Sequence, residues 1–285
     1  MKKSLIGLVY LLIACSISFA GDDKVTVKMH EPLSVEGVGA GQGVEWRDGL
    51  FYFYGDRGIG VMREYRVTDN ALEYTGKELQ FTVQGADTAS HPTGLTWHRD
   101  FGTFLGDTVS GKGTIFKIDW ESLLEDGNLD NAVINKALDD LAVNGTRPEF
   151  VTVDGRAMIA TADYGEVENA IRLYDPEALA SAEKTSDPGV LIKSIPCTPW
   201  VQTIHWMEDR GLLVLVQNQI EGLLWRLTLV DLEASFESGK SEIVQVLDFD
   251  PRDELEGFHF VSPELGIFVS SSREDNVIFG DFSWE

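Results

Sequence analysis

Apolar and polar positions alternate in short segments of this sequence, and these segments recur at a nearly constant spacing. Each segment has two apolar residues separated by one position; the five pairs are Val44/Trp46, Leu95/Trp97, Val151/Val153, Ile204/Trp206 and Phe258/Phe260. An apolar residue at every second position is typical of a half-buried β-strand. The first members of the pairs are 51, 56, 53 and 54 residues apart. We therefore expect one structural unit to be repeated five times.

Further strand-forming segments follow each of these pairs. The second strands are expected in LFYFYGD, GTFLGDT, AMIATAD, LLVLVQN and GIFVSSS, and the third strands in VMREYRV, TIFKIDW, AIRLYDP, LLWRLTL and NVIFGDF. In the middle repeats a short helical segment such as 120–124 or 176–179 comes next, and then a fourth strand such as 189–193 or 242–246. Tandem four-stranded units predict the blades of a β-propeller, because an irregular sandwich would not need equal spacing.

The fifth repeat reaches Glu285 before a fourth strand can form. The segment Val25–Met29 alternates as a strand does, and it is expected to supply the missing strand and close the ring. No linker or low-complexity tract divides the array. The predicted fold is thus all-β: residues 21–285 form a single five-bladed propeller of four-stranded blades, closed by the N-terminal strand.

Residues 1–20 have the features of a signal peptide. Lys2 and Lys3 precede the apolar stretch Leu5–Ala14, which is too short to span a bilayer comfortably, and no later stretch is apolar enough to do so. Cleavage after Ala20 would give a periplasmic or secreted protein. The segment Leu12–Cys15 also matches a lipobox, which would give an outer-membrane lipoprotein anchored through Cys15. We favour cleavage after Ala20, because the residues just before it continue the apolar stretch.

The charge and the cysteine content narrow the possible partners. The formal net charge is −24, and it becomes −26 without residues 1–20, which contain two lysines and no acidic residue. Such a charge argues against nucleic acids and anionic lipid surfaces as partners. Beyond Cys15 the sequence has Cys197 alone, so no internal disulfide is expected, and its thiol is interpreted as inert.

Polar residues recur at the starts of the predicted inner strands, where a propeller has one mouth of its axial channel. They are Gln42, Thr93, Glu149, Gln202 and Glu256. Carboxylate and amide oxygens suit Ca²⁺, whereas Zn²⁺ would favour His and Cys, which are absent from this set. Gln42, Glu149 and Glu256 are therefore the candidate ligands of a divalent cation, with Ca²⁺ favoured. The alternative is that these polar strand ends hydrogen-bond neighbouring blades.

Three further residues near that mouth are candidates for catalysis. His91 begins an inner strand and is a candidate general base, or a turn residue before Pro92. Asp163 ends a second strand and is either a base or the cap of a turn. Arg147 could stabilise an anionic intermediate. His205 and His259 occupy one equivalent strand position and are interpreted as packing residues, and the Trp and Phe residues of the repeated pairs as core between blades.

Two of the repeated segments resemble a known group of propellers. Gln42–Trp46 matches a Glu-Gly-Pro-x-Trp pattern except at its first and third places, and Pro148–Phe150 stands where a Pro-Asn-Gly pattern is found. Here the chain resembles the gluconolactonase, regucalcin and strictosidine-synthase-like propellers, although those have six blades. The resemblance implies a divalent metal, often Ca²⁺, at the channel mouth, with Gln42, Glu149 and Glu256 as its ligands, and hydrolysis of lactones or esters.

The expected function is therefore that of an exported, metal-supported hydrolase of a lactone, ester or related small molecule. One alternative is a non-catalytic propeller that binds a ligand or a partner protein on the same face. Another is a glycoside hydrolase that acts on a carbohydrate with Glu149 and Glu256 as its acid and base. The side chains that converge at the channel mouth would distinguish these functions.

Overall fold

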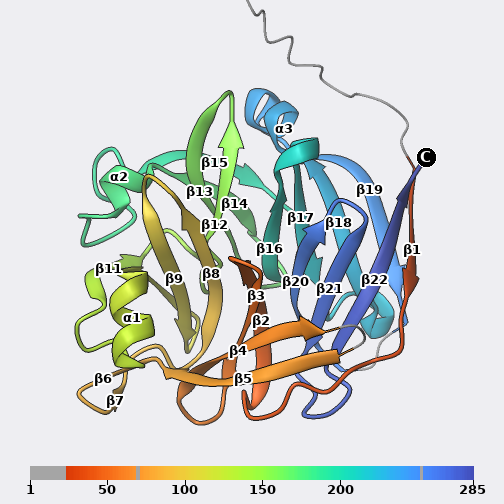
Figure 1. Ribbon diagram of the computed structural model, residues 1–285. Helices are drawn as coiled ribbons and strands as arrows, with labels where there is room; N and C mark the ends of the chain where they lie inside the picture. Colours follow the sequence, from red (N-terminus) through yellow and green to blue (C-terminus); the bar gives the residue numbers. More distant parts are fainter. Residues whose placement is uncertain (1–23, 69–70, 251–252) are drawn as a thin grey trace, which may run out of the picture.

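The computed structural model describes residues 24–68, 71–250 and 253–285. The predicted signal peptide, with Cys15 and both processing sites, lies outside the described residues, so export and lipidation stay predictions. The described chain forms five four-stranded antiparallel sheets and a two-stranded ribbon (Figure 1). No helix in these three ranges is long and apolar enough to cross a membrane.

Each sheet is one blade, with four strands that follow one another from the axis outwards. The first blade has β2 (Ala40–Arg47), β3 (Leu50–Asp56), β4 (Gly60–Thr68) and β5 (Ala71–Gln80). The second has β8 (Pro92–His98), β9 (Gly102–Val109), β10 (Lys112–Ile118) and β11 (Val133–Asp139). The third has β12 (Glu149–Val153), β13 (Arg156–Ala162), β14 (Ala170–Tyr174) and β15 (Leu191–Pro196). The fourth has β16 (Val201–Met207), β17 (Leu212–Gln217), β18 (Trp225–Asp231) and β19 (Glu242–Phe249). The fifth has β20 (Leu255–Ser262), β21 (Leu265–Ser270), β22 (Val277–Trp284) and β1 (Val25–Met29).

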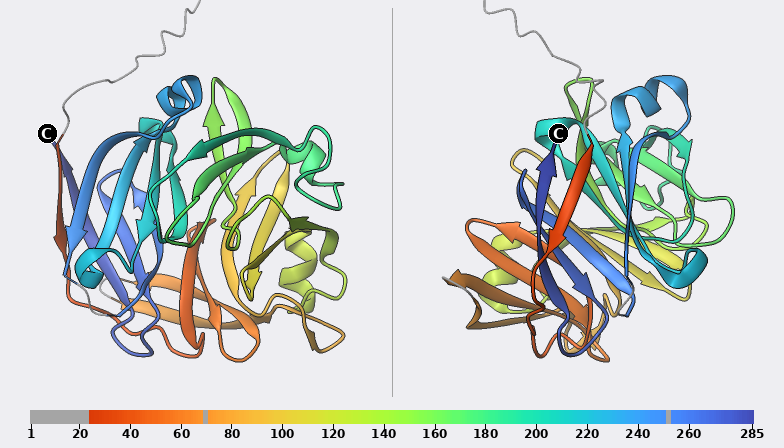
Figure 2. Two further views of the ribbon diagram at one scale, coloured as in Figure 1. Left: turned by 180° about the vertical axis from the view of Figure 1, so that it is seen from behind. Right: turned by 90° about the vertical axis from the view of Figure 1, so that its right-hand side faces the viewer.

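The innermost strands follow one another around a closed ring. Strand β2 contacts β8, β8 contacts β12, β12 contacts β16, β16 contacts β20, and β20 contacts β2 again. Figure 2 shows the same arrangement of blades from behind and from the side. Five sheets whose inner strands close on one another are the blades of a five-bladed β-propeller, and the predicted fold is confirmed.

The N-terminal strand closes the last blade. Strand β1 pairs antiparallel with β22, from Val25 opposite Trp284 to Met29 opposite Gly280, and the two strands lie side by side in Figure 1. Gln245 on the neighbouring β19 also holds β1: its side-chain Oε1 accepts the Val25 N–H and its Nε2 donates to the Val25 carbonyl, both at 2.8 Å. The closure expected from the sequence is confirmed.

Strand β3 shows why the alternating pattern produces this fold. Phe51 and Phe53 are buried in a cluster with residues of the fifth blade, including Ile267. Tyr52 and Tyr54, on the other face, are buried in a cluster with residues of the second blade, including Leu105. Successive side chains of a strand point to opposite faces of its sheet. Each blade therefore contributes to two hydrophobic cores, one with each neighbour.

Short helices connect the third and fourth strands of the middle blades, as predicted. They are α1 (Trp120–Asp126), α2 (Pro176–Leu179) and α3 (Leu232–Ser238). Each begins after an aspartate whose carboxylate accepts a backbone N–H of the first turn; these are Asp119, Asp175 and Asp231. The ribbon of β6 (Thr82–Val83) and β7 (Ala86–Asp87) and the 3-10 helices Glu208–Arg210 and Glu221–Leu223 lie between other strands.

The inner strand of the third blade has a different register from the one predicted. The sequence pattern pairs Glu149 with Gln42, but Glu149 lies level with His205 of the fourth blade, with Oε1 3.3 Å from Nδ1. Glu149 is four residues from the end of its strand, whereas Glu45 and His205 are two residues from the ends of theirs. The third inner strand therefore continues two residues further beyond the level of the axial residues, and the predicted pairing of Glu149 with Gln42, in place of Glu45, is displaced by three residues. A shift by an odd number of residues reverses the faces of a strand.

Candidate functional site

One polar side chain from each inner strand points towards the propeller axis. The five are Glu45, Thr96, Glu149, His205 and His259, and all of them line one pocket. We call this set the axial ring. Each of its members precedes an aromatic residue that belongs to the other face of its strand, as the period of two requires.

Backbone hydrogen bonds link the axial ring from blade to blade. Thr96 Oγ1 accepts the Phe150 N–H at 2.9 Å, and Glu149 Oε1 accepts the Trp206 N–H at 3.0 Å. In the same way, His205 Nε2 accepts the Phe260 N–H at 3.1 Å. These bonds fix the side chains of the second, third and fourth blades, because each acceptor is held by the backbone of the next blade.

In the described part of the chain, the series of bonds is missing at two joints, between the fifth blade and the first and between the first blade and the second. Within the described residues, the side chains of Glu45 and His259 have no hydrogen-bond partner. Their strands, β2 and β20, are neighbours in the ring of inner strands. Both side chains line the axial cavity, so they are the two members of the axial ring that are available to a ligand.

Glu149 and His205 form a buried pair with a defined proton position. Because Nε2 of His205 accepts the Phe260 N–H, its other nitrogen, Nδ1, carries the proton, and it lies 3.3 Å from Glu149 Oε1. Burial lowers the pKa of His205 to about 3, so the imidazole is neutral. The ring of His259 lies beside it, with 4.3 Å between the ring centroids.

Burial sets the protonation states of the other three titratable groups. It raises the pKa of Glu149 to about 7, although the Trp206 N–H favours the charged form. Burial, and then the charge of Glu149, raise the pKa of Glu45 well above its ordinary value. Burial, and then His205, lower the pKa of His259 well below its ordinary value. These shifts favour the neutral, protonated form of Glu45 and the neutral form of the His259 imidazole.

The axial ring lies at the bottom of a pocket that opens where the inner strands end. The innermost part has a volume of about 10 Å³, enough for about one water molecule. It leads into a pocket of about 360 Å³, within the size range of small-molecule sites. Trp97, Phe150, Trp206 and Phe260 line its walls, together with Glu208 and Asp209. Trp206 and Phe260 also pack against the cores between blades, as the sequence predicts. The mouth considered from the sequence lies at the opposite end of the axis, where the inner strands start.

Arg147 and Glu256 lie at that opposite end. Arg147 is buried; its Nε donates to the Gln202 carbonyl at 2.8 Å, and its Nη1 donates to the carbonyls of Asn144 and Ala162 at 3.2 and 3.3 Å. Burial lowers its pKa to about 10, opposed by the negative charge of Glu256. Burial and Glu254 raise the pKa of Glu256 well above its ordinary value. The Nε and Nη1 groups of Arg147 therefore donate to backbone carbonyls at the end of the axis opposite to the pocket.

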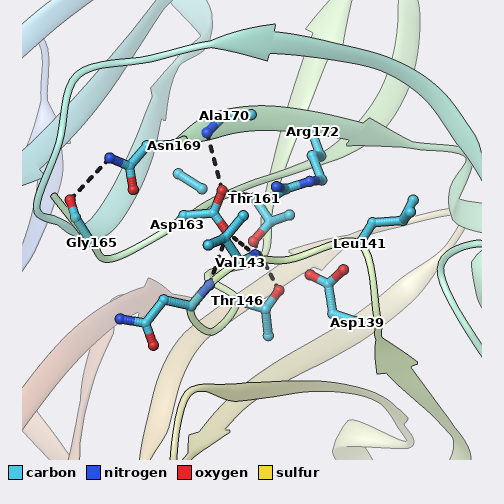
Figure 3. A network of polar contacts seen from close by, with 12 residues as sticks. Asp139, Leu141, Val143, Thr146, Thr161, Asp163, Gly165, Asn169, Ala170 and Arg172 are labelled. Carbon is cyan, nitrogen blue, oxygen red and sulfur yellow. Dashed lines mark hydrogen bonds and ion pairs between the residues drawn. The ribbon is translucent and has the colours of Figure 1, made fainter. Parts of the chain in front are cut away.

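Asp163 is held in a network of polar contacts (Figure 3). Its side chain is inaccessible to solvent; Oδ1 accepts the N–H groups of Val143 and Asn144, at 2.7 and 3.3 Å. Oδ2 accepts the Ala170 N–H at 3.1 Å and lies 2.8 Å from Nη1 of the buried Arg172. A carboxylate with both oxygens engaged in this way supports the loop before β12 and is in no position to act as a base.

His91 and Gln42 lie outside the axial ring. The side chain of His91 is 40 % exposed, with Nδ1 3.7 Å from Oδ2 of Asp56, and its backbone N–H donates to Asp107. Gln42 is buried. Cys197 is half-buried, and burial raises the pKa of its thiol to about 12, in agreement with the inert thiol expected.

The expected cation ligands are not brought together as a group. Glu149 belongs to the axial ring, and its Oε1 is engaged by Trp206 and His205, whereas Glu256 lies near Arg147. In the described ranges, no three His, Cys, Asp or Glu side chains are placed to hold a metal ion. Binding of Ca²⁺ by Gln42, Glu149 and Glu256 stays a prediction, and no catalytic step is derived through a cation.

The sequence pattern misses four members of the axial ring. It gives Glu45 and Thr96 no role at the site, and it favours packing roles for His205 and His259. The signal that is present in the sequence is their shared position, directly before the aromatic residue of each repeat. An ionisable residue at that position in four of five blades is unusual for a site of simple packing.

A Glu149→Gln substitution should stabilise the protein, and the gain should grow with pH. Folding raises the pKa of Glu149 from 4.5 to about 7, so ionisation penalises the folded state increasingly between these values. Gln keeps the acceptor for Trp206 and cannot ionise. We expect a gain of about 3 kcal/mol at pH 8 and less than half of that at pH 5, measured by urea unfolding. The exposed Glu183→Gln is the control, and an equal effect of both variants would contradict the buried charge.

Comparisons with known proteins give no family. No family model and no curated protein matches the chain. Among solved structures, the chain is similar to the PQQ-bound aldose sugar dehydrogenase of Streptomyces coelicolor, at 9 % identity over 91 % of this chain and 99 % of that one, with a TM-score of 0.48. It is also similar to hydrazine synthase of Kuenenia stuttgartiensis, at 13 % identity over 83 % of this chain, with a TM-score of 0.45, and spans 57 % of that chain. A third is the Cps50 (Swd1) β-propeller domain of Myceliophteria thermophila, at 10 % identity over 89 % and 99 % of the two chains, with a TM-score of 0.43. At this level of similarity no activity is transferred, and the propeller assignment rests on the strand pairing of the chain itself.

Proposed function

We propose that the protein is a hydrolase of a lactone, an ester or a related small molecule, with its active centre in the axial pocket. The observation that carries this proposal is the interruption of the axial ring. Glu45 and His259 have no hydrogen-bond partner among the described residues, and they line a cavity that connects to the 360 Å³ pocket. We assign His259 as the general base and Glu45 as the general acid.

The protonation states support these two roles. A general base must be free of its proton before the reaction, and burial keeps the imidazole of His259 neutral by lowering its pKa. A general acid must hold its proton, and burial together with Glu149 raises the pKa of Glu45. Two titratable groups whose environments move their pKa values in opposite useful directions are the usual sign of an acid and base pair.

The reaction balances with these two groups and one water molecule. The water oxygen bonds to the carbonyl carbon of the substrate while His259 takes one proton from it. The bond between that carbon and the leaving oxygen then breaks, and Glu45 gives its proton to the leaving oxygen. The products are a carboxylic acid and an alcohol, joined in one molecule when the substrate is a lactone. Transfer of the proton from His259 to Glu45 through solvent restores the starting state.

Glu149 and His205 act as positioning residues in this proposal. The negative charge of Glu149 favours the imidazolium that forms on His259, opposing the effects of burial and of His205. Glu149 Oε1 accepts the Trp206 N–H and lies 3.3 Å from Nδ1 of His205, which is itself held by the Phe260 N–H, so the carboxylate is kept beside His205. The pair therefore needs Glu149 in its ionised form.

The second candidate is a glycoside hydrolase, and the carboxylate pair of the axial ring favours it. Glu45 and Glu149 are close enough for the charge of one to raise the pKa of the other, and aromatic side chains line the pocket around them. In this function Glu45 would be the acid and Glu149 the base or nucleophile, in place of the pair Glu149 and Glu256 that the sequence suggests. His259→Asn would then leave most of the activity, whereas it should abolish hydrolysis of esters.

The pH dependence of hydrolysis tests the proposal. Purified protein is assayed with panels of p-nitrophenyl esters, aliphatic lactones and p-nitrophenyl glycosides. With the esters or lactones that are turned over, kcat/KM should rise through about pH 7 as Glu149 ionises, and fall at higher pH as Glu45 loses its proton. The acid limb should move or disappear in Glu149→Gln. The proposal would be contradicted if no ester or lactone is hydrolysed at millimolar concentration, or if kcat/KM does not change between pH 5 and pH 9.

A further inference from the structure

The acidic side chains that line the 360 Å³ pocket are Glu45, Glu149, Glu208 and Asp209, and among the described residues no lysine or arginine lines it. Burial favours the neutral form of Glu45, so the formal negative charges of the lining are those of Glu208 and Asp209, joined by Glu149 above its pKa of about 7. The two histidines of the lining are kept neutral by burial, which lowers both of their pKa values. The whole sequence carries a formal net charge of −24. An anionic ligand would meet only like charges on entering this pocket.

The remaining walls are mainly aromatic, and some of the rings are held in place by polar contacts. The indole N–H of Trp206 donates to Glu208 Oε2, which also accepts the hydroxyl of Thr152 at 3.2 Å. Glu208 is thus fixed against the edge of this indole at the pocket wall. The ring of Trp97 is 43 % exposed, and the guanidinium of Arg47 lies 4.5 Å from its centre. A ring of the pocket wall therefore already contacts a cation.

Aromatic faces and carboxylates around one small pocket favour one kind of ligand. The face of an aromatic ring attracts a cation through its quadrupole, most strongly when the cation is poorly hydrated, as a substituted ammonium is. The carboxylates add direct attraction. We infer that the pocket selects a small organic ammonium with an apolar body. This inference rests on the proposed function for the position of the site and adds the class of substrate: esters that carry an ammonium group.

Choline is a suitable probe because a neutral molecule of nearly the same shape exists. The uncharged analogue is 3,3-dimethylbutan-1-ol, which has a carbon atom in place of the ammonium nitrogen. Isothermal titration calorimetry measures the affinities of choline and of the alcohol at the same ionic strength, and we expect choline to bind at least tenfold more tightly. In a second series of titrations, the affinity for choline should fall as the sodium chloride concentration is raised. Equal affinities, or binding of the alcohol alone, would overturn the inference.

Two substitutions locate the binding of choline. Trp206→Leu removes a ring of the wall and Glu208→Gln a carboxylate beside it, and each should weaken choline binding about fivefold or more. Glu183→Gln makes the same change of charge on an exposed surface of the third blade and should leave the affinity unchanged. If all three variants bind choline like the original protein, choline binds elsewhere and the inference is wrong.

The binding experiment and the assay of hydrolysis can fail independently. Tight binding of choline without hydrolysis of any ester would support the ligand class and contradict the proposed function. If neutral esters are hydrolysed, this activity is lost in Glu45→Gln and choline does not bind measurably, the proposed function is supported and the ligand class is contradicted. Preferential hydrolysis of choline esters over the matching esters of 3,3-dimethylbutan-1-ol would support both.

Discussion

Glu45→Gln is expected to lower kcat/KM for ester or lactone hydrolysis by about 10²–10⁴-fold, because the amide cannot supply a proton to the leaving oxygen. The substitution keeps the size of the side chain. It should also keep or raise stability, since the folded protein favours the neutral form of Glu45. The measurement is steady-state kinetics at pH 7–8 together with thermal unfolding, so that loss of activity is separated from loss of structure.

His259→Asn should cause a loss of similar size, because the base that activates water is removed. The double variant should be little worse than either single one, since an acid and a base that act in one reaction are not additive. His30→Asn is the matched control: His30 is 43 % exposed and contacts Asp281 on the fifth blade, away from the axial ring. If Glu45→Gln or His259→Asn keeps activity within threefold of the original protein, the assignment of that residue is wrong.

Asp163→Ala is expected to destabilise the protein by about 3–5 kcal/mol, the second large effect. The substitution removes the acceptor of three backbone N–H groups and leaves the guanidinium of Arg172 buried without its ion-pair partner. Chemical denaturation at neutral pH measures the free energy of unfolding. Asp248→Ala is the control, because Asp248 pairs with Arg226 at 2.6 Å where both side chains are about one third exposed. That pair should contribute less than about 1 kcal/mol.

The same variant also tests the role that the sequence suggests for Asp163. If Asp163→Ala unfolds like Asp248→Ala and yet hydrolyses no ester, then Asp163 is the catalytic base and the role assigned to it from the structure is wrong. If it is strongly destabilised while the folded fraction at low temperature keeps its activity, the role is structural. The stability of Asp163→Asn should lie between that of the original protein and that of Asp163→Ala. The amide keeps an oxygen for the N–H groups of Val143 and Asn144 but loses the charge that faces Arg172.

The architecture could be predicted because it depends on properties that are local or periodic in the chain. Strand β3 alternates Phe51, Tyr52, Phe53 and Tyr54, and both of its faces are buried between blades, as such a pattern requires. Equal spacing of the repeats determines the number of blades. The incomplete last repeat determines that Val25–Met29 must pair with it. Each of these inferences uses distance along the chain, which the sequence contains.

The site depends on distances through space, which tertiary structure alone decides. Glu45, Glu149, His205 and His259 come from four separate repeats and meet because the inner strands surround one axis. The further extension of the third inner strand decided that Glu149 joins them and Gln42 does not. The sequence by itself thus determined the five blades and their closure. The register of one strand, and with it the protonation states around the axis, was decided by packing, because burial and neighbouring charges exist only once the ring has closed.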